Sequence, residues 1–442
     1  MKPQAEHHIP LLVLTCFAIF FVNLNTLDPN IMEARNFTTA REMLHDGNWL
    51  LTTLNGAPRY QKPPLPTWLT AVSGAVFGLK NLWALRLPAA LAALLLVLFS
   101  YKFLVKLTKN KPFAFIGALV LATSFYVVFA GRNGQWDIFT HAFMMAAIYY
   151  LFRFFKLGRD GPNFKKNRFV FALWAGLFFG LSFMSKGPVS VYALLLPFLI
   201  AFAVVYKPKG FRGKRLPLFV FTVAAIGISS WWYGYTYFYD TAGAAITAQR
   251  ETANWTNYNV RPFYYYWSFF TQSGVWAIMA FIGLLYPYLK TRVFHKKAYT
   301  FTVLWVLASV VLLSVIPEKK SRYLLPVLIP LAFSTAFYIE YLFRGFSTLK
   351  ATWETWPVYF NFGLVALIGI VFPLGGYLYL GENLHGHWSW FVALSVALFV
   401  LGVYMLKGLF QKNIKKVFYA TLVFIAGVVC FGMPLSAAIS VN

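Results

Sequence analysis

Acidic and basic side chains are scarce in this sequence, and a few of them are grouped where they could do chemistry. Asp28 and Glu33 lie close together and are followed by Arg35 and Lys62, while Asp137 precedes a long apolar run. A carboxylate can take a proton from a hydroxyl, and Lys or Arg can stabilise an anion such as a phosphate. The candidate bases are therefore Glu33, Asp137 and Asp28.

The composition places these residues in a membrane protein. Of the 442 residues, 59% are hydrophobic and only 12% are charged. Soluble domains carry about 25% charged residues, so an ordinary soluble fold is excluded. Aromatic residues make up 20% of the chain, which excludes disorder. The two cysteines, Cys16 and Cys430, lie in apolar runs and have neither disulfide nor metal-site spacing.

Long apolar runs predict an all-α fold in which residues 1–442 form a single polytopic membrane domain. A spanning helix needs roughly 20 mostly apolar residues, because lipid offers no partners to the polar groups of the backbone. About thirteen runs meet this requirement. They lie near 9–24, 84–105, 112–130, 138–155, 169–185, 188–206, 216–235, 266–289, 299–316, 323–343, 357–380, 388–406 and 417–437.

The charge distribution predicts how the chain is oriented. With the N-terminus inside and spans that alternate in direction, about two thirds of the 39 Lys and Arg lie on the inner side. Most of the 13 Asp and Glu lie on the outer side. This asymmetry follows the positive-inside rule. The net charge of +26 is therefore a topology signal, and it indicates the lipid bilayer and no nucleic acid as the partner.

Two outer loops, residues 25–83 and 236–265, are long enough to carry a site. In the first loop, Asp28 or Asn30 can cap a helix and Gly47 can end it. Apolar residues between these positions recur at spacings of three and four. This pattern predicts an amphipathic helix on the outer membrane surface.

Glu33 and Arg35 are two positions apart, so on a helix their side chains point in different directions. They can share a site only at the N-terminal end of the helix, where free backbone N–H groups and the helix dipole favour an anion. The prolines after Lys62 keep the backbone extended and present that side chain in a fixed direction. We therefore expect a phosphate near residues 30–35, bound by Arg35 and Lys62.

The motifs of the first loop resemble those of a known family. Residues 30–36 read Asn-Ile-Met-Glu-Ala-Arg-Asn, and residues 62–68 read Lys-Pro-Pro-Leu-Pro-Thr-Trp. This loop resembles the first periplasmic loop of the bacterial protein mannosyltransferase-like glycosyltransferases, whose nearest well-known relatives here are the aminoarabinose transferases that modify lipid A. Weaker similarities follow in order at residues 131–137, 185–188, 261–265 and 320–326.

The resemblance implies a GT-C fold and an enzyme of the bacterial inner membrane. Such an enzyme transfers a sugar from a polyprenyl-phosphate carrier to a glycolipid, glycan or protein acceptor on the periplasmic side. The further candidates for binding the donor phosphate are Arg261, Lys186, Arg322 and Tyr323. Arg261 and Arg322 could equally anchor the chain at the interface, and Lys186 could extend towards the interface without a catalytic role.

Three positions depart from the family pattern. Met32 stands where the aminoarabinose transferases usually have an Asp, which leaves the catalytic carboxylate open among the three candidates. Gln61 replaces a usual Glu, and Asn259 lies in a stretch where those relatives often have a His. No Asp-x-Asp or Asp-x-Glu motif occurs in the sequence. We therefore expect transfer without a metal or other cofactor.

A transporter or flippase of lipid-linked sugar is the main alternative. It predicts ionisable residues at mid-membrane, or broken helices in two repeated halves. The predicted spans contain almost no acids and no internal repeat is found, whereas the candidate catalytic residues lie on the outer side. The enzyme is therefore the favoured hypothesis, and a relative that binds its lipid without catalysis is the third.

Overall fold

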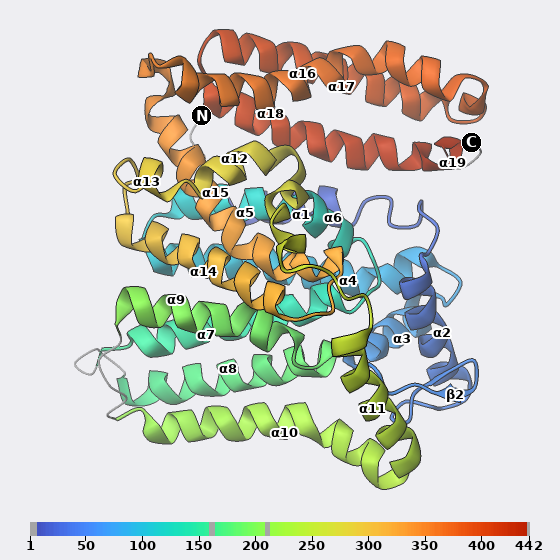
Figure 1. The fold of residues 1–442 in the computed structure, drawn as a ribbon. Helices are drawn as coiled ribbons and strands as arrows, with labels where there is room; N and C mark the ends of the chain where they lie inside the picture. Colours follow the sequence, from blue (N-terminus) through green and yellow to red (C-terminus); the bar gives the residue numbers. More distant parts are fainter. Residues whose placement is uncertain (1–6, 159–163, 208–212, 440–442) are drawn as a thin grey trace.

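The computed structural model describes residues 7–158, 164–207 and 213–439, and these are almost entirely helical (Figure 1). Within the described residues, nine helical segments are long and apolar enough to span a membrane. A tenth is counted if the bent pair α5 (Lys111–Ala122) and α6 (Phe125–Gly131) forms one span. The nine segments contain α4 (Leu82–Thr108), α7 (Asp137–Lys156), α8 (Phe164–Lys186), α10 (Arg215–Tyr239), α14 (Lys296–Val315), α15 (Leu325–Gly345), α16 (Thr352–Leu380), α17 (Trp388–Phe410) and α18 (Ile414–Gly427). The all-α multi-span fold is confirmed, and the predicted count of about thirteen spans is not.

Shorter elements complete the chain. The α-helices among them are α1 (His8–Phe20), α2 (Ile31–His45), α3 (Leu65–Phe77), α9 (Leu196–Tyr206), α11 (Thr241–Asn257), α12 (Ala277–Gly283), α13 (Tyr286–Leu289) and α19 (Ser436–Ile439). The 3₁₀ and π turns are η1 (Val191–Leu195), η2 (Phe263–Tyr266), η3 (Phe269–Trp276), η4 (Ser321–Leu324), η5 (Phe346–Thr348), η6 (Gly381–Leu384), η7 (Val428–Gly432) and η8 (Met433–Leu435). Two short strands, β1 (Thr53–Leu54) and β2 (Ala57–Pro58), form an antiparallel hairpin.

The long helices are stacked in layers (Figure 1). Helices α16, α17 and α18 form one outer layer, α8 and α10 lie on the opposite side, and α4, α5, α7, α14 and α15 lie between them. A continuous apolar core runs through these layers and contains fully buried rings such as Phe103 and Trp305. Helices α2, α3 and α11 and the β hairpin gather at one end of the stack. That end is where the two long outer loops meet.

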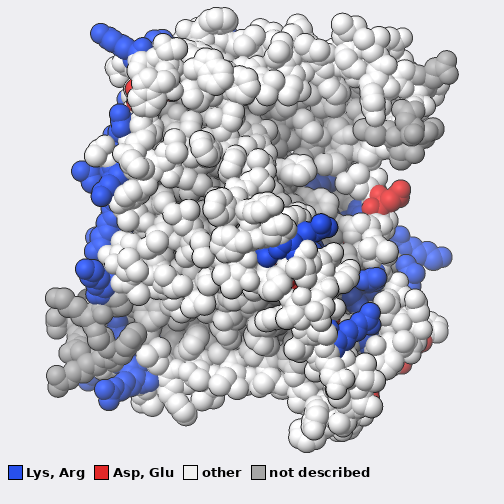
Figure 2. All heavy atoms as spheres, viewed as in Figure 1, with Lys and Arg blue, Asp and Glu red and all other residues white. Residues whose placement is uncertain are grey.

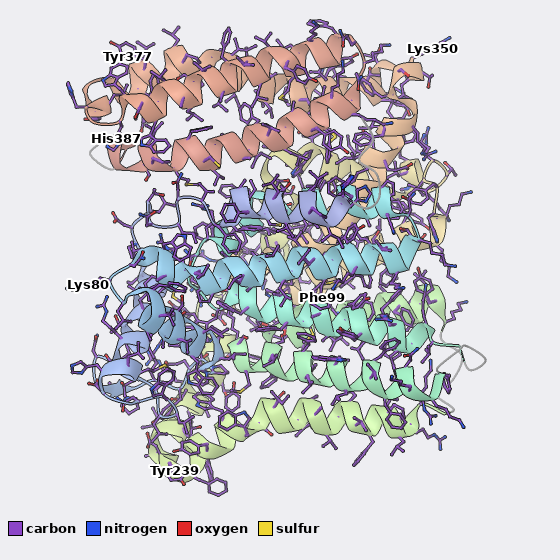
Figure 3. The ribbon with its side chains drawn as sticks, turned by 180° about the vertical axis from the view of Figure 1, so that it is seen from behind. Lys80, Phe99, Tyr239, Lys350, Tyr377 and His387 are labelled. Carbon is purple, nitrogen blue, oxygen red and sulfur yellow. The ribbon has the colours of Figure 1, made fainter. Side chains whose placement is uncertain are left out.

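The positions of the helix ends confirm that the spans alternate in direction. Lys80, Tyr239 and His387 are expected on the outer side, and they lie at the same end of the bundle in Figure 3. Lys350 is expected on the inner side and lies at the opposite end. On the face in Figure 2, Lys and Arg line the edge formed by the inner helix ends, and a broad band with few charges adjoins that edge.

Helix α2 has the capping that its sequence predicts. Its N-cap is Asn30, whose side chain accepts hydrogen bonds from the backbone N–H groups of Met32 and Glu33 at 3.0 and 3.2 Å. The Glu33 carboxylate accepts in return from the N–H of Asn30, which completes a capping box. Gly47 follows the helix with φ of 76°, a conformation that favours glycine.

The second long loop is mostly helix α11, none of whose residues is buried. Two contacts tie it to the first loop. The Tyr60 hydroxyl donates to the Asp240 carboxylate at 2.8 Å, just before the helix begins. Further along, Glu251 forms an ion pair with Lys62 at 3.5 Å. A hydrogen bond from the N–H of Gly243 and the one from Tyr60 lower the pKa of Asp240.

The predicted span 266–289 is wrong as a single helix, because the chain there is broken into η3, α12 and α13. Gly274 has φ of 68°, which an α-helix cannot contain. A Cβ at this glycine would lie 2.7 Å from the Cβ of Phe125 on α6. The break therefore lets the backbone of η3 approach α6 closely, and only glycine fits there.

Candidate functional site

The first helical turn of α7 and the last turn of α8 bring together an acidic and a basic side chain. The Asp137 carboxylate forms an ion pair with the Lys186 ammonium, and their side chains are only 9% and 5% exposed. Removing two charges from water is costly, so buried ion pairs near a membrane usually mark a functional site. The sequence predicts both residues, and their pairing makes them the centre of the site.

Three other predicted residues surround this pair. The Lys186 ammonium lies 5.0 Å from the centre of the Tyr323 ring. Lys62 and Arg322 are both close enough to Lys186 to interact with it electrostatically. The chain therefore gathers cations from the first loop and from η4 around Lys186, the partner of Asp137. Such a cluster can hold a phosphate beside a general base.

Glu318 is a carboxylate of this region that the sequence did not single out. It lies between α14 and η4, where its carboxylate pairs with Lys320 and accepts a hydrogen bond from the Tyr323 hydroxyl at 3.1 Å. Tyr323 thus contacts two ion pairs, because its ring also faces Lys186. The sequence indicates Glu318 only by its position, two residues before the motif at residues 320–326.

Glu33, a predicted base, belongs to a second buried ion pair of the chain. Its side chain is 2% exposed and both oxygens bind the guanidinium of Arg86, at 2.8 and 3.0 Å. One oxygen also accepts from the N–H of Gly134 at 2.8 Å, and the other caps α2 through Asn30. These bonds give Glu33 a structural role, and Glu33 and Arg86 also line a cavity of about 540 Å³, so its predicted role as the base stays a prediction. The cap also occupies N–H groups that we expected to be free for a phosphate near residues 30–35.

Arg35, Asp28 and Arg261 are placed differently from the central pair. All three are exposed, and in the described part of the chain no hydrogen bond or ion pair joins them to Asp137 or Lys186. The Arg35 guanidinium contacts the sulfur of Met32 at 3.9 Å. Asp28 lies at a largely apolar cavity of about 540 Å³ between α6 and α18. Their predicted roles in catalysis and donor binding stay predictions.

The inner face of α2 clamps the loop that leads into Asp137. Asn36, which is fully buried, donates from its side chain to the carbonyl of Gly134 at 2.8 Å, and Glu33 holds the N–H of the same residue. The side-chain oxygen of Asn36 accepts from the Thr67 hydroxyl at 2.7 Å. Thr67 lies in the first turn of α3, directly after the Lys62 segment. Asn36 therefore links the loop before Asp137 to the start of α3.

Arg59 strengthens the same clamp from the β hairpin. It donates to the Thr39 hydroxyl of α2 at 3.0 Å, and its guanidinium lies 4.9 Å from the centre of the Trp136 ring. Burial, together with the nearby charge of Arg35, lowers the pKa of Arg59 to about 10. Arg59 stays charged at neutral pH, so it can hold the residue that precedes Asp137.

Asn36→Ala tests this clamp. We expect a loss of stability of about 1–3 kcal/mol, because the buried Gly134 carbonyl and Thr67 hydroxyl lose their partner. Turnover should fall more than donor affinity, since the displaced group is the loop before Asp137. Kinetics over a range of donor concentrations would separate the two effects. Asn48→Ala, which removes a part-buried bond to Thr53 in the same loop, is the matched control and should leave turnover near that of the wild type.

Comparison with solved structures shows which known fold the chain has. ArnT from Cupriavidus metallidurans bound to undecaprenyl phosphate superposes with a TM-score of 0.70 and 19% identity, over 97% of this chain and 78% of that one. The arabinosyltransferase EmbB from Mycobacterium smegmatis gives a TM-score of 0.55 and 15% identity, over 98% of this chain and 41% of that one. The fold is that of the GT-C glycosyltransferases, as the sequence predicts.

Sequence comparison adds a family match and individual relatives. Residues 61–233 match the family described as dolichyl-phosphate-mannose-protein mannosyltransferase. The undecaprenyl phosphate-alpha-4-amino-4-deoxy-L-arabinose arabinosyl transferase 1 of Proteus mirabilis is 25% identical over 352 residues, which cover 77% of this chain and 61% of that protein. The chain thus spans about three fifths of the length of this relative. The resemblance predicted from the first loop is confirmed, and the apolar helices and relatives together indicate a multi-pass inner-membrane protein.

Proposed function

We propose that this protein is a glycosyltransferase that moves a sugar from a polyprenyl-phosphate carrier to an acceptor hydroxyl. The observation that carries the proposal is the buried Asp137–Lys186 pair, with Tyr323 and Lys62 beside it. The names of relatives support the carrier, because several are transferases of aminoarabinose from undecaprenyl phosphate. The sugar is a pentose or a hexose, and the acceptor is a glycolipid, a glycan or a protein.

The chemistry assigns a task to each charged group. Asp137 takes the proton of the acceptor hydroxyl as its oxygen forms a bond to the anomeric carbon. The bond between that carbon and the phosphate oxygen breaks, and the phosphate leaves with both bonding electrons. Lys186, Lys62 and Arg322 stabilise its charge. A displacement in one step inverts the anomeric configuration.

The proposed reaction takes place on the periplasmic side and without a metal. The orientation is supported by the Lys and Arg that line the opposite helix ends, where the positive-inside rule places the cytoplasm. Lysine and arginine supply the positive charge that a metal supplies in other transferases. Among the described residues, no three His, Cys, Asp or Glu side chains are grouped to hold a metal ion. Metal independence remains a prediction, and transfer measured with and without a chelator tests it.

Mass spectrometry of membrane lipids from cells with and without the gene tests the proposed function. Deletion should cause a polyprenyl monophosphate-sugar to accumulate and should remove one sugar mass from a surface molecule. Complementation with the wild-type gene should reverse both changes, and complementation with Asp137→Asn should reverse neither. Carrier lipids that are unchanged while the gene is expressed would contradict the proposal and favour the transporter or the inactive relative.

A further inference from the structure

We propose that Glu318 and the aromatic rings around it form a subsite for the sugar of the donor, distinct from the cations that bind its phosphate. This inference rests on the proposed function and extends it to Glu318, which has no role in the proposed reaction. The ligand that the subsite recognises is a set of hydrogen-bond donors on a sugar ring, namely its hydroxyl or amino groups.

The backbone holds Glu318 in a defined position. Residues 316–320 connect α14 to η4, and Glu318 forms an isolated antiparallel bridge with Val260 from the second long loop. The N–H of Glu318 donates to the carbonyl of Trp255 at 3.3 Å, and the N–H of Lys319 donates to that of Asn259 at 3.1 Å. Because the second long loop braces this segment at three residues, the backbone of Glu318 is held in place when a ligand binds.

A partially exposed aromatic ring, that of Tyr258, lies beside the ion pair of Glu318. Lys320, the ion-pair partner of Glu318, places its ammonium 4.6 Å from the centre of the Tyr258 ring. Tyr258 is 52% exposed, so a large part of its side chain is open to a ligand. An aromatic face can cover the C–H face of a sugar, while a carboxylate accepts hydrogen bonds from its hydroxyls. Both elements of carbohydrate recognition are therefore present.

Tyr323 lies between this subsite and the cations that are proposed to bind the phosphate. Its hydroxyl donates to Glu318, and its ring faces the Lys186 ammonium at 5.0 Å. A phosphate is repelled by the Glu318 carboxylate and attracted to the cations around Asp137 and Lys186. With the phosphate on that side of Tyr323, a sugar attached to it can reach Glu318 on the other side.

Binding of two matched lipids to the full-length protein in detergent tests the inference. The first lipid is the sugar-bearing carrier purified from the deletion strain, and the second is the same lipid after mild acid has removed its sugar. Glu318→Gln removes the negative charge and should weaken binding of the sugar-bearing lipid about 10-fold. Binding of the bare polyprenyl phosphate should change less than about 2-fold, which also shows that the variant is folded.

Glu354→Gln is the matched control. Glu354 has a side chain that is 11% exposed, as Glu318 does, accepts from the Tyr288 hydroxyl at 2.9 Å and lies 3.6 Å from Arg292. It belongs to α16 at the other end of the bundle, so binding of both lipids should be unchanged. Tyr258→Leu, which keeps the Glu318 ion pair, should weaken the sugar-bearing lipid roughly 3-fold and leave the bare lipid alone.

Each contrary result has a separate meaning. An equal loss of both lipids in Glu318→Gln would assign Glu318 to the fold or the phosphate and overturn the subsite. Unchanged binding of both lipids would overturn it as well. If the wild-type protein binds neither lipid, the proposed function itself fails, and the subsite with it.

Discussion

Asparagine in place of Asp137 is expected to lower sugar transfer by about 10²- to 10⁴-fold, the range that the loss of a general base causes. Asparagine has nearly the shape of aspartate and can still accept a hydrogen bond from Lys186, but it cannot take a proton from the acceptor. Donor affinity should be nearly unchanged, because the phosphate contacts come from other residues. Transfer assayed with purified protein and carrier lipid, alongside donor binding, measures both quantities.

The same substitution leaves Lys186 charged and buried without its partner, so a control for folding is needed. The double variant Asp137→Asn with Lys186→Met removes both charges. It should recover the thermal stability that Asp137→Asn loses, but it should not recover transfer. A single variant that transfers sugar at the wild-type rate would remove Asp137 as the base and return the role to Glu33 or Asp28.

Glu33→Gln is expected to destabilise the protein by about 3–5 kcal/mol, the cost of breaking a buried ion pair by removing one partner. The Arg86 guanidinium would remain 3% exposed with no carboxylate beside it. The bonds that Glu33 makes to the N–H groups of Asn30 and Gly134 would weaken too. Thermal unfolding in detergent measures the loss, and transfer should be expressed per amount of folded protein.

Glu42→Gln provides the comparison on the same helix. The Glu42 carboxylate accepts from the Asn55 backbone at 2.6 Å and from the Thr53 hydroxyl in the β hairpin, and it has no ion-pair partner among the described residues. Its loss should cost no more than about 1 kcal/mol. Wild-type stability in Glu33→Gln, combined with a 100-fold loss of transfer, would restore Glu33 as the catalytic carboxylate.

Much of the fold could be predicted from local patterns in the sequence. The cap at Asn30 and the stop at Gly47 define α2, and apolar runs locate most of the long helices. The segment 266–289 misled the prediction because its composition is that of a span. The contact of Gly274 with Phe125 on α6, which no local pattern contains, is what breaks it.

The candidate site could be predicted as a set of residues but not as a set of pairs. Asp137 and Lys186 were both expected to be functional, yet they are 49 positions apart and meet only because α7 and α8 pack antiparallel. Arg86 lies 53 positions from Glu33, inside a predicted span, so nothing in the sequence marked it as the partner of that carboxylate. The ion pair with Arg86 gives Glu33 a structural role in addition to its predicted catalytic one.

Helix α11 lies against the site, yet none of its residues is buried. Elements with little buried apolar surface detach at a free energy far below that of global unfolding. The first loop contacts α11 through one ion pair from Lys62 and contacts Asp240, just before the helix, through one hydrogen bond from Tyr60, while the Trp255 carbonyl of α11 accepts from the N–H of Glu318. Opening at α11 is therefore expected to cost less free energy than unfolding of the helical stack. A bulky substrate can gain entry by local opening while the transmembrane helices stay packed.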